Sequence, residues 1–504
     1  MDSNAEGFAQ TVTFNRSESG MLSYVGRVNY SYDDKYLFEF MLRSDASAKF
    51  APQNYWGMFP SWSAGWVISD EKWFDKDKTK IDFLKIRGSF GILGKDNVNA
   101  WLWTQLYTRN PDKGPIFGTN SSTNTSATIR MPKQGVNPDV HWDKTYKTNF
   151  GIDMAFLKNR MSANLDFYYD MGREMFASHQ GTSYYPNTVG IQPAPENFGE
   201  VDTYGVELSL GWKDKIGKDM SYWVKLTTGY NDNKIRETGW KAAYDFDKLV
   251  RNERSDRGLW GYECIGMFRS YQEINEYFDK YSITKYLGNT KENVHPGMLI
   301  YKDVRGQYDE STGTFGPADG IVDEQDYIKI SHRASNPYGG TLNFGFSYKV
   351  FSISAQFGAS WGAYSLVPTT MRKESYSEYS NVSAMWKDMF VYEDIYDANN
   401  IVTVAQNRNA KYPNIRYSSV NGAPSTFWKV SAATVQLRNM TVAYALPKEW
   451  LKIIGISSCR FNLTCQNVFN FLNPYPEGAW ASWAGSYGYY PNLRKFTLGV
   501  NVSF

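Results

Sequence analysis

The chain ends on a segment in which apolar and polar residues alternate without interruption. In its last eleven residues, RKFTLGVNVSF, the apolar positions are Phe496, Leu498, Val500, Val502 and Phe504. A β-strand points successive side chains to opposite faces, so this segment would have one apolar and one polar face. About ten residues is also the length that a tilted strand needs to cross a bilayer. The segment therefore predicts a transmembrane strand, although a strand of a soluble sandwich would alternate in the same way.

Segments with the same alternation recur along the whole chain. In the first of them, Tyr24, Val28 and Tyr30 share one face, whereas Arg27 and Asn29 lie on the other. We predict thirteen strands, at 22–32, 36–43, 58–68, 83–92, 147–156, 161–169, 202–212, 221–231, 338–348, 352–361, 434–444, 459–469 and 494–504. Aromatic residues make up 17% of the sequence, as expected where aromatic girdles mark two membrane interfaces. The sequence thus predicts an all-β antiparallel transmembrane barrel; it has no 18-residue apolar run for a membrane-spanning helix.

The connections between these segments alternate in length. Short or medium connections fall at 33–35, 69–82, 157–160, 213–220, 349–351 and 445–457, and long ones at 93–146, 170–201, 232–337, 362–433 and 470–493. Outer-membrane barrels have short periplasmic turns and long extracellular loops. The alternation therefore predicts a multi-pass protein of the bacterial outer membrane with its C-terminus in the periplasm.

An odd number of strands has a consequence for closure. Neighbouring strands of an antiparallel barrel run in opposite directions, but strands one and thirteen run the same way. We therefore expect an odd number of further strands to come from a missing segment or from another chain. The first residues, MDSNAEGFAQ, lack the basic start and apolar core of a signal peptide. Since an outer-membrane protein must be exported, its signal would be missing from this chain or removed.

Several stretches carry a family resemblance. They are LSYVGRVNYSYDDKYLFEFMLRSDASAKFAP at 22–52, WGMFPSWSAGWVISDEKWF at 56–74, IDFLKIRGSFGILG at 81–94, HPGMLIYKDV at 295–304, DGIVDEQD at 319–326, NAKYPNIRYS at 409–418, and VQLRNMTVAYALPKEWLKIIGISSCRFNLTCQNVFNF at 435–471. In these stretches the chain resembles the SusC/RagA family of TonB-dependent outer-membrane transporters. The resemblance implies a TonB box, a plug and a 22-stranded barrel, of which residues 1–504 would form only the C-terminal part. Twenty-two minus thirteen leaves nine strands, an odd number.

The resemblance also implies a function and partners. It implies TonB-energised import of oligomeric nutrients, either glycans or peptides, together with a SusD-like surface lipoprotein and a periplasmic TonB complex. A passive porin or a surface adhesin is the alternative. We expect no enzymatic activity, because the histidines His141, His179, His295 and His332 lie in different loops and the sequence contains no catalytic motif. A net charge of +2 gives no reason to expect a nucleic-acid partner.

One acidic loop is a candidate calcium site. The family pattern D-x-N-x-D-G-x-x-D-x-x-D has the ligand spacing of an EF-hand loop, and here Asp303, Asp319, Asp323 and Asp326 match its carboxylates while the Ile321 carbonyl takes the seventh position. Arg305 stands at the third position, and residues 307–318 interrupt the pattern. Either Asp309 substitutes from this insertion or the loop is an acidic, solvated loop stabilised by Asx turns.

The remaining candidates lie in the loops and in the lumen. Tryptophans of the predicted external loops could contact a sugar or peptide, or pack within the loops and against a partner: Trp101, Trp103, Trp240, Trp260, Trp480 and Trp483. Charged residues predicted to face inward would line the channel or pair with a plug: Arg27, Glu39, Arg43, Glu207 and Lys225. Residues 270–287 predict a helix packed on a loop, with Tyr271, Ile274, Phe278 and Tyr281 on one face.

Overall fold

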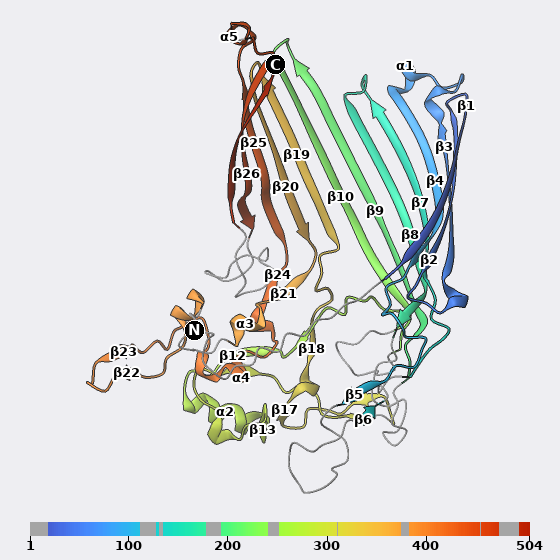
Figure 1. Ribbon diagram of the computed structural model, residues 1–504. Helices are drawn as coiled ribbons and strands as arrows, with labels where there is room; N and C mark the ends of the chain where they lie inside the picture. The colour runs from blue at the N-terminus through green and yellow to red at the C-terminus, as the bar shows by residue number, and fades with distance from the viewer. Residues whose placement is uncertain are drawn as a thin grey trace, which may run out of the picture.

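Thirteen antiparallel strands form one curved sheet, in which each strand pairs with its neighbours in chain order (Figure 1). The structure is a computed structural model that describes residues 19–110, 128–130, 135–177, 193–239, 251–309, 311–373, 383–453, 455–472 and 493–504. The strands are β1 (Met21–Tyr32), β2 (Tyr36–Ser47), β3 (Trp56–Val67), β4 (Ile81–Lys95), β7 (Asp143–Phe156), β8 (Met161–Ala177), β9 (Glu196–Ile216), β10 (Met220–Glu237), β19 (Tyr338–Tyr348), β20 (Phe351–Trp361), β25 (Thr434–Ala445), β26 (Ser458–Leu472) and β27 (Lys495–Ser503). All thirteen predicted strands and the all-β class are confirmed.

The alternation of residue types separates the two faces of this sheet. On β27, the apolar side chains of Phe496, Leu498 and Val500 are 69, 74 and 51% exposed. Their partners across the strand pair are also mostly apolar, as in the pairs Leu463–Leu498 and Phe461–Val500. The polar residues between them pair with polar residues or glycine on the other face, as in Asn462–Gly499. The sheet therefore has a bare apolar outer face and a polar inner face.

Several strands extend further toward the long loops than the alternation predicts. β8 continues to Ala177 instead of 169, and β9 begins at Glu196 instead of 202. These extensions are held by polar contacts: Asp202 accepts hydrogen bonds from Arg236 Nε at 2.5 Å and forms an ion pair with Arg173 at 2.7 Å. Since these residues do not alternate between apolar and polar, the predicted boundaries stop too early.

The connections at the two ends of the sheet differ as predicted. Tight turns join β1 to β2, β7 to β8, β9 to β10 and β19 to β20 at the end where the chain terminates, at the top of Figure 1. The longest loops gather at the opposite end. α1 (Lys76–Thr79) and α5 (Lys448–Lys452) lie at the end that carries the turns.

The two longest loops pack together into a folded unit. We call the described residues 251–333 and 383–431 the loop unit. Its core joins Phe268, Tyr286 and Leu299 from the first loop to Phe390 and Val420 from the second, all of them buried. Its short strands are β11 (Leu259–Gly261), β12 (Cys264–Met267), β13 (Lys285–Tyr286), β14 (Leu299–Tyr301), β15 (Tyr308–Asp309), β16 (Thr314–Phe315), β17 (Ile321–Val322), β18 (Ile328–Ser331), β22 (Ile395–Tyr396), β23 (Val402–Val404) and β24 (Lys429–Ser431). Helix α4 (Ser418–Asn421) belongs to it, while α3 (Thr369–Arg372), β21 (Tyr364–Leu366), β5 (Thr108–Asn110) and β6 (Thr128–Arg130) lie in neighbouring loop segments.

Helix α2 (Tyr271–Tyr281) confirms the predicted helix but is shorter than 270–287. The helix begins after Ser270, whose side chain accepts a hydrogen bond from the Glu273 amide, and ends where Ser282 adopts a left-handed conformation. Its buried face is formed by Ile274, Tyr277 and Phe278, so the expected contact face was wrong at Tyr271 and Tyr281, which are exposed. None of the helices in the described segments is long and apolar enough to span a membrane.

Candidate transport surface

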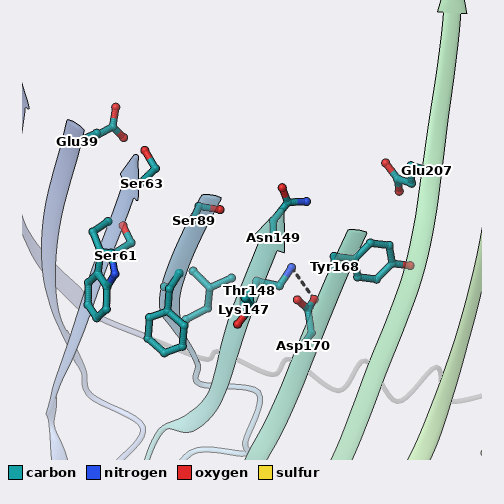
Figure 2. Close-up of a pocket in the computed structure, with 14 residues that line it drawn as sticks. Glu39, Ser61, Ser63, Ser89, Lys147, Thr148, Asn149, Tyr168, Asp170 and Glu207 are labelled. Carbon is teal, nitrogen blue, oxygen red and sulfur yellow. Dashed lines mark ion pairs between the residues drawn. The ribbon is translucent and has the colours of Figure 1, made fainter. Parts of the chain in front are cut away.

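The inner face of the sheet is a polar wall. Over β2 to β9 it contains a hollow of about 510 Å³. Figure 2 labels the polar residues that line it on adjacent strands: Glu39, Ser61, Ser63, Ser89, Lys147, Thr148, Asn149, Tyr168, Asp170 and Glu207. Its lining also includes Trp62, Phe90, Gly91 and Leu93. A wall of hydroxyl, amide and charged groups can form hydrogen bonds with a polar ligand or with another protein surface. It is the part of the sheet that can contact a hydrophilic molecule.

Ion pairs neutralise much of the charge on this part of the wall. Lys147 and Asp170, on β7 and β8, are joined at 3.0 Å by the dashed line in Figure 2. Arg87 on β4 contacts Asp153 at 3.1 Å and Asp166 at 2.8 Å, so a single guanidinium bridges three strands. Sequence analysis did not single out this network. The strand period contains the signal, because Arg87 lies between the outward-facing residues Ile86 and Gly88.

The predicted inward-facing charges are found on this same wall. Arg27 forms an ion pair with Glu39, and Arg43 pairs with Asp45 at 2.7 Å. Glu207 lines the hollow, whereas Lys225 lies further along the sheet, opposite Gly211 and Asn343. The residues therefore line one continuous surface, without converging on a single point.

The wall changes character in its last five strands. In β19, β20, β25, β26 and β27 the only charged residues are the cations Arg438, Arg460 and Lys495. Amides and hydroxyls dominate, with hydrogen bonds between Asn439 and Gln356 at 2.9 Å and between Thr441 and Thr464 at 3.1 Å. This sector therefore offers many neutral hydrogen-bonding groups and no carboxylate.

The acidic loop is held by its own main chain. Asp326 is fully buried; its Oδ1 accepts hydrogen bonds from the amides of Val304 and Arg305 at 2.7 and 3.1 Å, and its Oδ2 accepts one from Asp323 at 3.0 Å. Asp303 accepts a hydrogen bond from the Gly320 amide at 2.7 Å. Gly320 has a φ of +79°, and a Cβ there would approach the Ser282 carbonyl oxygen to 2.5 Å. The carboxylates thus fold the loop by capping backbone amides.

An EF-hand loop needs several carboxylate oxygens converging on one ion, and in this loop the Asp303 and Asp326 carboxylates also accept hydrogen bonds from main-chain amides. Both oxygens of Asp326 face amides, and Arg305 packs its guanidinium 4.1 Å from the centre of the Phe315 ring. Burial raises the pKa of the Asp303 and Asp326 carboxyls and lowers the pKa of the Arg305 guanidinium. No group of three or more His, Cys, Asp or Glu side chains within the described segments could hold a metal ion. Calcium binding through Asp303, Asp319, Ile321, Asp323 and Asp326 stays a prediction.

The predicted tryptophans do not form one site in the part of the chain that the structure describes. Trp101 and Trp103 lie next to each other after β4, with ring centroids 5.9 Å apart, and Trp101 is exposed. Trp260 lies on β11, where Lys329 Nζ is 5.0 Å from its ring centroid. Trp240, Trp480 and Trp483 lie outside the described residues. A role in cargo binding stays a prediction for all six.

Comparison with known proteins gives matches over nearly the whole chain. The TonB-dependent receptor SusC of Bacteroides thetaiotaomicron is 32% identical over 503 residues, which are 96% of this chain and 44% of that receptor. TonB-dependent receptor P39 of Formosa agariphila is 24% identical over 518 residues, which are 96% of this chain and 46% of the relative. No family model matches the sequence. The chain spans about half the length of the curated relatives it matches, as expected for a portion of such a receptor.

The fold has a counterpart among solved structures. A chain of the RagAB peptide transporter matches with a TM-score of 0.68 at 20% identity, over 96% of this chain and 48% of that chain. At this identity the match establishes the fold alone. Together with the homologues, it confirms the resemblance that the sequence motifs indicate.

Proposed function

We propose that this chain, which is homologous to the TonB-dependent receptors over almost its whole length, forms the C-terminal part of the 22-stranded barrel of an outer-membrane importer. The whole receptor would take up oligomeric nutrients, glycans or peptides, with energy delivered by a periplasmic TonB complex. The remaining nine strands and the plug would be supplied by a segment outside residues 1–504. The protein itself would transport its cargo without chemically changing it.

The two-faced sheet is the observation that supports this proposal best. The apolar outer face extends from Tyr24 on β1 to Phe496 on β27, and both side chains are more than half exposed. A soluble monomer rarely exposes a continuous apolar face of this extent, whereas lipid solvates it. The polar inner face would then line a lumen of the kind through which a hydrophilic oligomer can pass.

The loop unit suggests how a partner would be engaged. It carries exposed aromatic and aliphatic side chains, among them Tyr271 on α2 and Ile395 and Tyr396 on β22. Protein–protein interfaces are enriched in aromatic and other apolar side chains of this kind. We assign them to contact with a SusD-like surface lipoprotein, which would close the extracellular end over the cargo.

Uptake with and without the proton gradient tests the proposal. Cells that carry the full receptor and its lipoprotein are given labelled maltodextrins or a labelled tryptic peptide digest as probes, and a strain without the receptor is the control. We expect receptor-dependent uptake of one probe class that falls at least tenfold when a protonophore collapses the gradient. Undiminished uptake would assign the protein as a passive porin. Binding of a probe to the cell surface without uptake would assign it as an adhesin.

A further inference from the structure

Five long side chains on the inner wall lie across glycines of a neighbouring strand. The pairs are Lys85 over Gly65, Arg87 over Gly151, Tyr168 over Gly205, Trp223 over Gly345, and Arg438 over Gly358. They occur on successive parts of the sheet, from β3 to β25. Figure 2 shows one of them, Tyr168, reaching sideways from β8 toward β9. Since the pattern recurs around the sheet, it describes the wall as a whole.

The glycines provide the space in which these side chains lie. Trp223 and Gly345 are directly opposite each other in the pairing of β10 with β19, and a Cβ on Gly345 would lie 2.5 Å from Cε2 of the indole. Arg87 and Gly151 are likewise opposite each other, and a Cβ on Gly151 would lie 2.5 Å from the guanidinium carbon. Real Cβ atoms essentially never come within 3.0 Å of a heavy atom outside their own residue and its two chain neighbours. Any other residue at these glycines would therefore displace the side chain above it.

A side chain displaced from its glycine can turn away from the plane of the sheet. Side chains of a strand ordinarily stand roughly perpendicular to the sheet. On the inner face, a perpendicular indole or guanidinium would project into the lumen. The glycine thus determines whether the long side chain covers the wall or narrows the space that the wall encloses.

We propose that these five glycines, which we call notches, leave room for the long inner side chains to lie flat against the sheet. The lumen then stays wide enough for a bulky oligomer to pass. Such a path fits cargo with the cross-section of an oligosaccharide or peptide; a single ion or small solute would not need it. The notches are distributed from β3 to β25, so they would keep long side chains out of the lumen on several sides. The inference rests on the proposed import function and adds a size limit set by identified residues.

Substitution of Gly345 tests the inference in the full receptor. Gly345→Ala should displace the indole of Trp223, and the double variant Gly345→Ala/Trp223→Ala should remove the displaced group. Gly339→Ala is the matched control on the same strand and face, because its nearest non-neighbouring atom, the Ala359 carbonyl oxygen, would lie an ordinary 3.7 Å from the new Cβ. Heat-modifiable migration in gels and surface labelling establish that each variant is folded in the outer membrane.

The uptake readout uses maltodextrins and peptides graded by length. We expect Gly345→Ala to lower uptake of the longest imported probes at least fivefold while the shortest are imported at the wild-type rate. The double variant should recover the long probes, and Gly339→Ala should match the wild type at every length. If Gly345→Ala does not reach the membrane, Gly358→Ala with its rescue Arg438→Ala repeats the test on β20 and β25.

Electron cryomicroscopy of the full receptor in lipid nanodiscs supplies the second readout. We expect the Trp223 indole to lie flat in the wild type and to point into the lumen in Gly345→Ala. An indole that stays flat, or a displaced indole with unchanged uptake of long probes, would overturn the inference. A wild type that imports neither probe class would overturn the proposed function itself, and the transport role of the notches with it.

Discussion

Asp326 is a predicted calcium ligand, but in the structure its carboxylate accepts hydrogen bonds from the main chain. Its position in the acidic loop matches a calcium ligand, but three backbone amides already use its two oxygens. A buried amide without an acceptor is costly, so a carboxylate at this place has a structural reason to be there. Sequence alone could find the carboxylates of the loop, because their spacing is visible. It could not find the direction in which each oxygen points.

Asp326→Ala should destabilise the loop unit. Hydrogen bonds to a charged acceptor contribute about 1.5–3 kcal/mol each, so the loss of three should cost at least about 4.5 kcal/mol. Hydrogen–deuterium exchange of the amides of Val304, Arg305 and Asp323 measures this effect directly. The exposed neighbour Glu324 provides the matched control, and Glu324→Ala should leave the exchange rates unchanged.

Repeating the exchange measurement with calcium and with a chelator distinguishes a capping role of Asp326 from a role as metal ligand. A capping role predicts fast exchange in Asp326→Ala both with calcium and with a chelator. Slower exchange of the wild type in calcium, with no such protection in Asp326→Ala, would instead identify Asp326 as a metal ligand.

At the scale of a strand, the period of two determines which substitutions the sheet can accept. On β26, Leu463 lies on the outer face opposite Val442 and Leu498, and its neighbour Asn462 lies on the inner face opposite Ala443 and Gly499. The two residues are adjacent in sequence and belong to the same pairs of strands. They should therefore differ only in the medium that surrounds their side chains.

Leu463→Arg should impair assembly of the barrel, whereas Asn462→Arg should be tolerated. A cation on the lipid-facing side near the middle of the bilayer costs about 2–4 kcal/mol, while a lumen-facing cation stays hydrated. The measurement is the fraction of receptor in the outer membrane that shows heat-modifiable migration. Equal tolerance of the two arginines would contradict lipid contact on the outer face. Recovery of the wild type as a stable monomer in detergent-free buffer would contradict it as well.

At the scale of the whole molecule, the sheet could be predicted from sequence and the loop unit could not. Each strand carries its own signal, because residues such as Phe150 and Ile152 alternate with Asn149 and Gly151. The loop unit depends on contacts between distant segments, as in the buried hydrogen bond that the Leu299 amide donates to Asn421 Oδ1. No local period marks such a contact. Periodicity predicted α2 inside the unit but not which of its tyrosines is buried, since that depends on the segments packed around it.

The orientation of the molecule in the membrane follows from the unequal ends of the sheet and can be tested with single cysteines. Lys218 lies in the tight turn between β9 and β10, and Asn399 lies between β22 and β23 in the loop unit; both are exposed. If the loops are extracellular, a membrane-impermeant maleimide should label Asn399→Cys in intact cells and Lys218→Cys only after the outer membrane is opened. Maleimide labelling of the native cysteines should be weak, because Cys459 and Cys465 are buried and burial raises the pKa of Cys264 to about 11. The reverse labelling pattern would place the C-terminus and the turns outside the cell, and the loop unit could then no longer receive cargo from a surface lipoprotein.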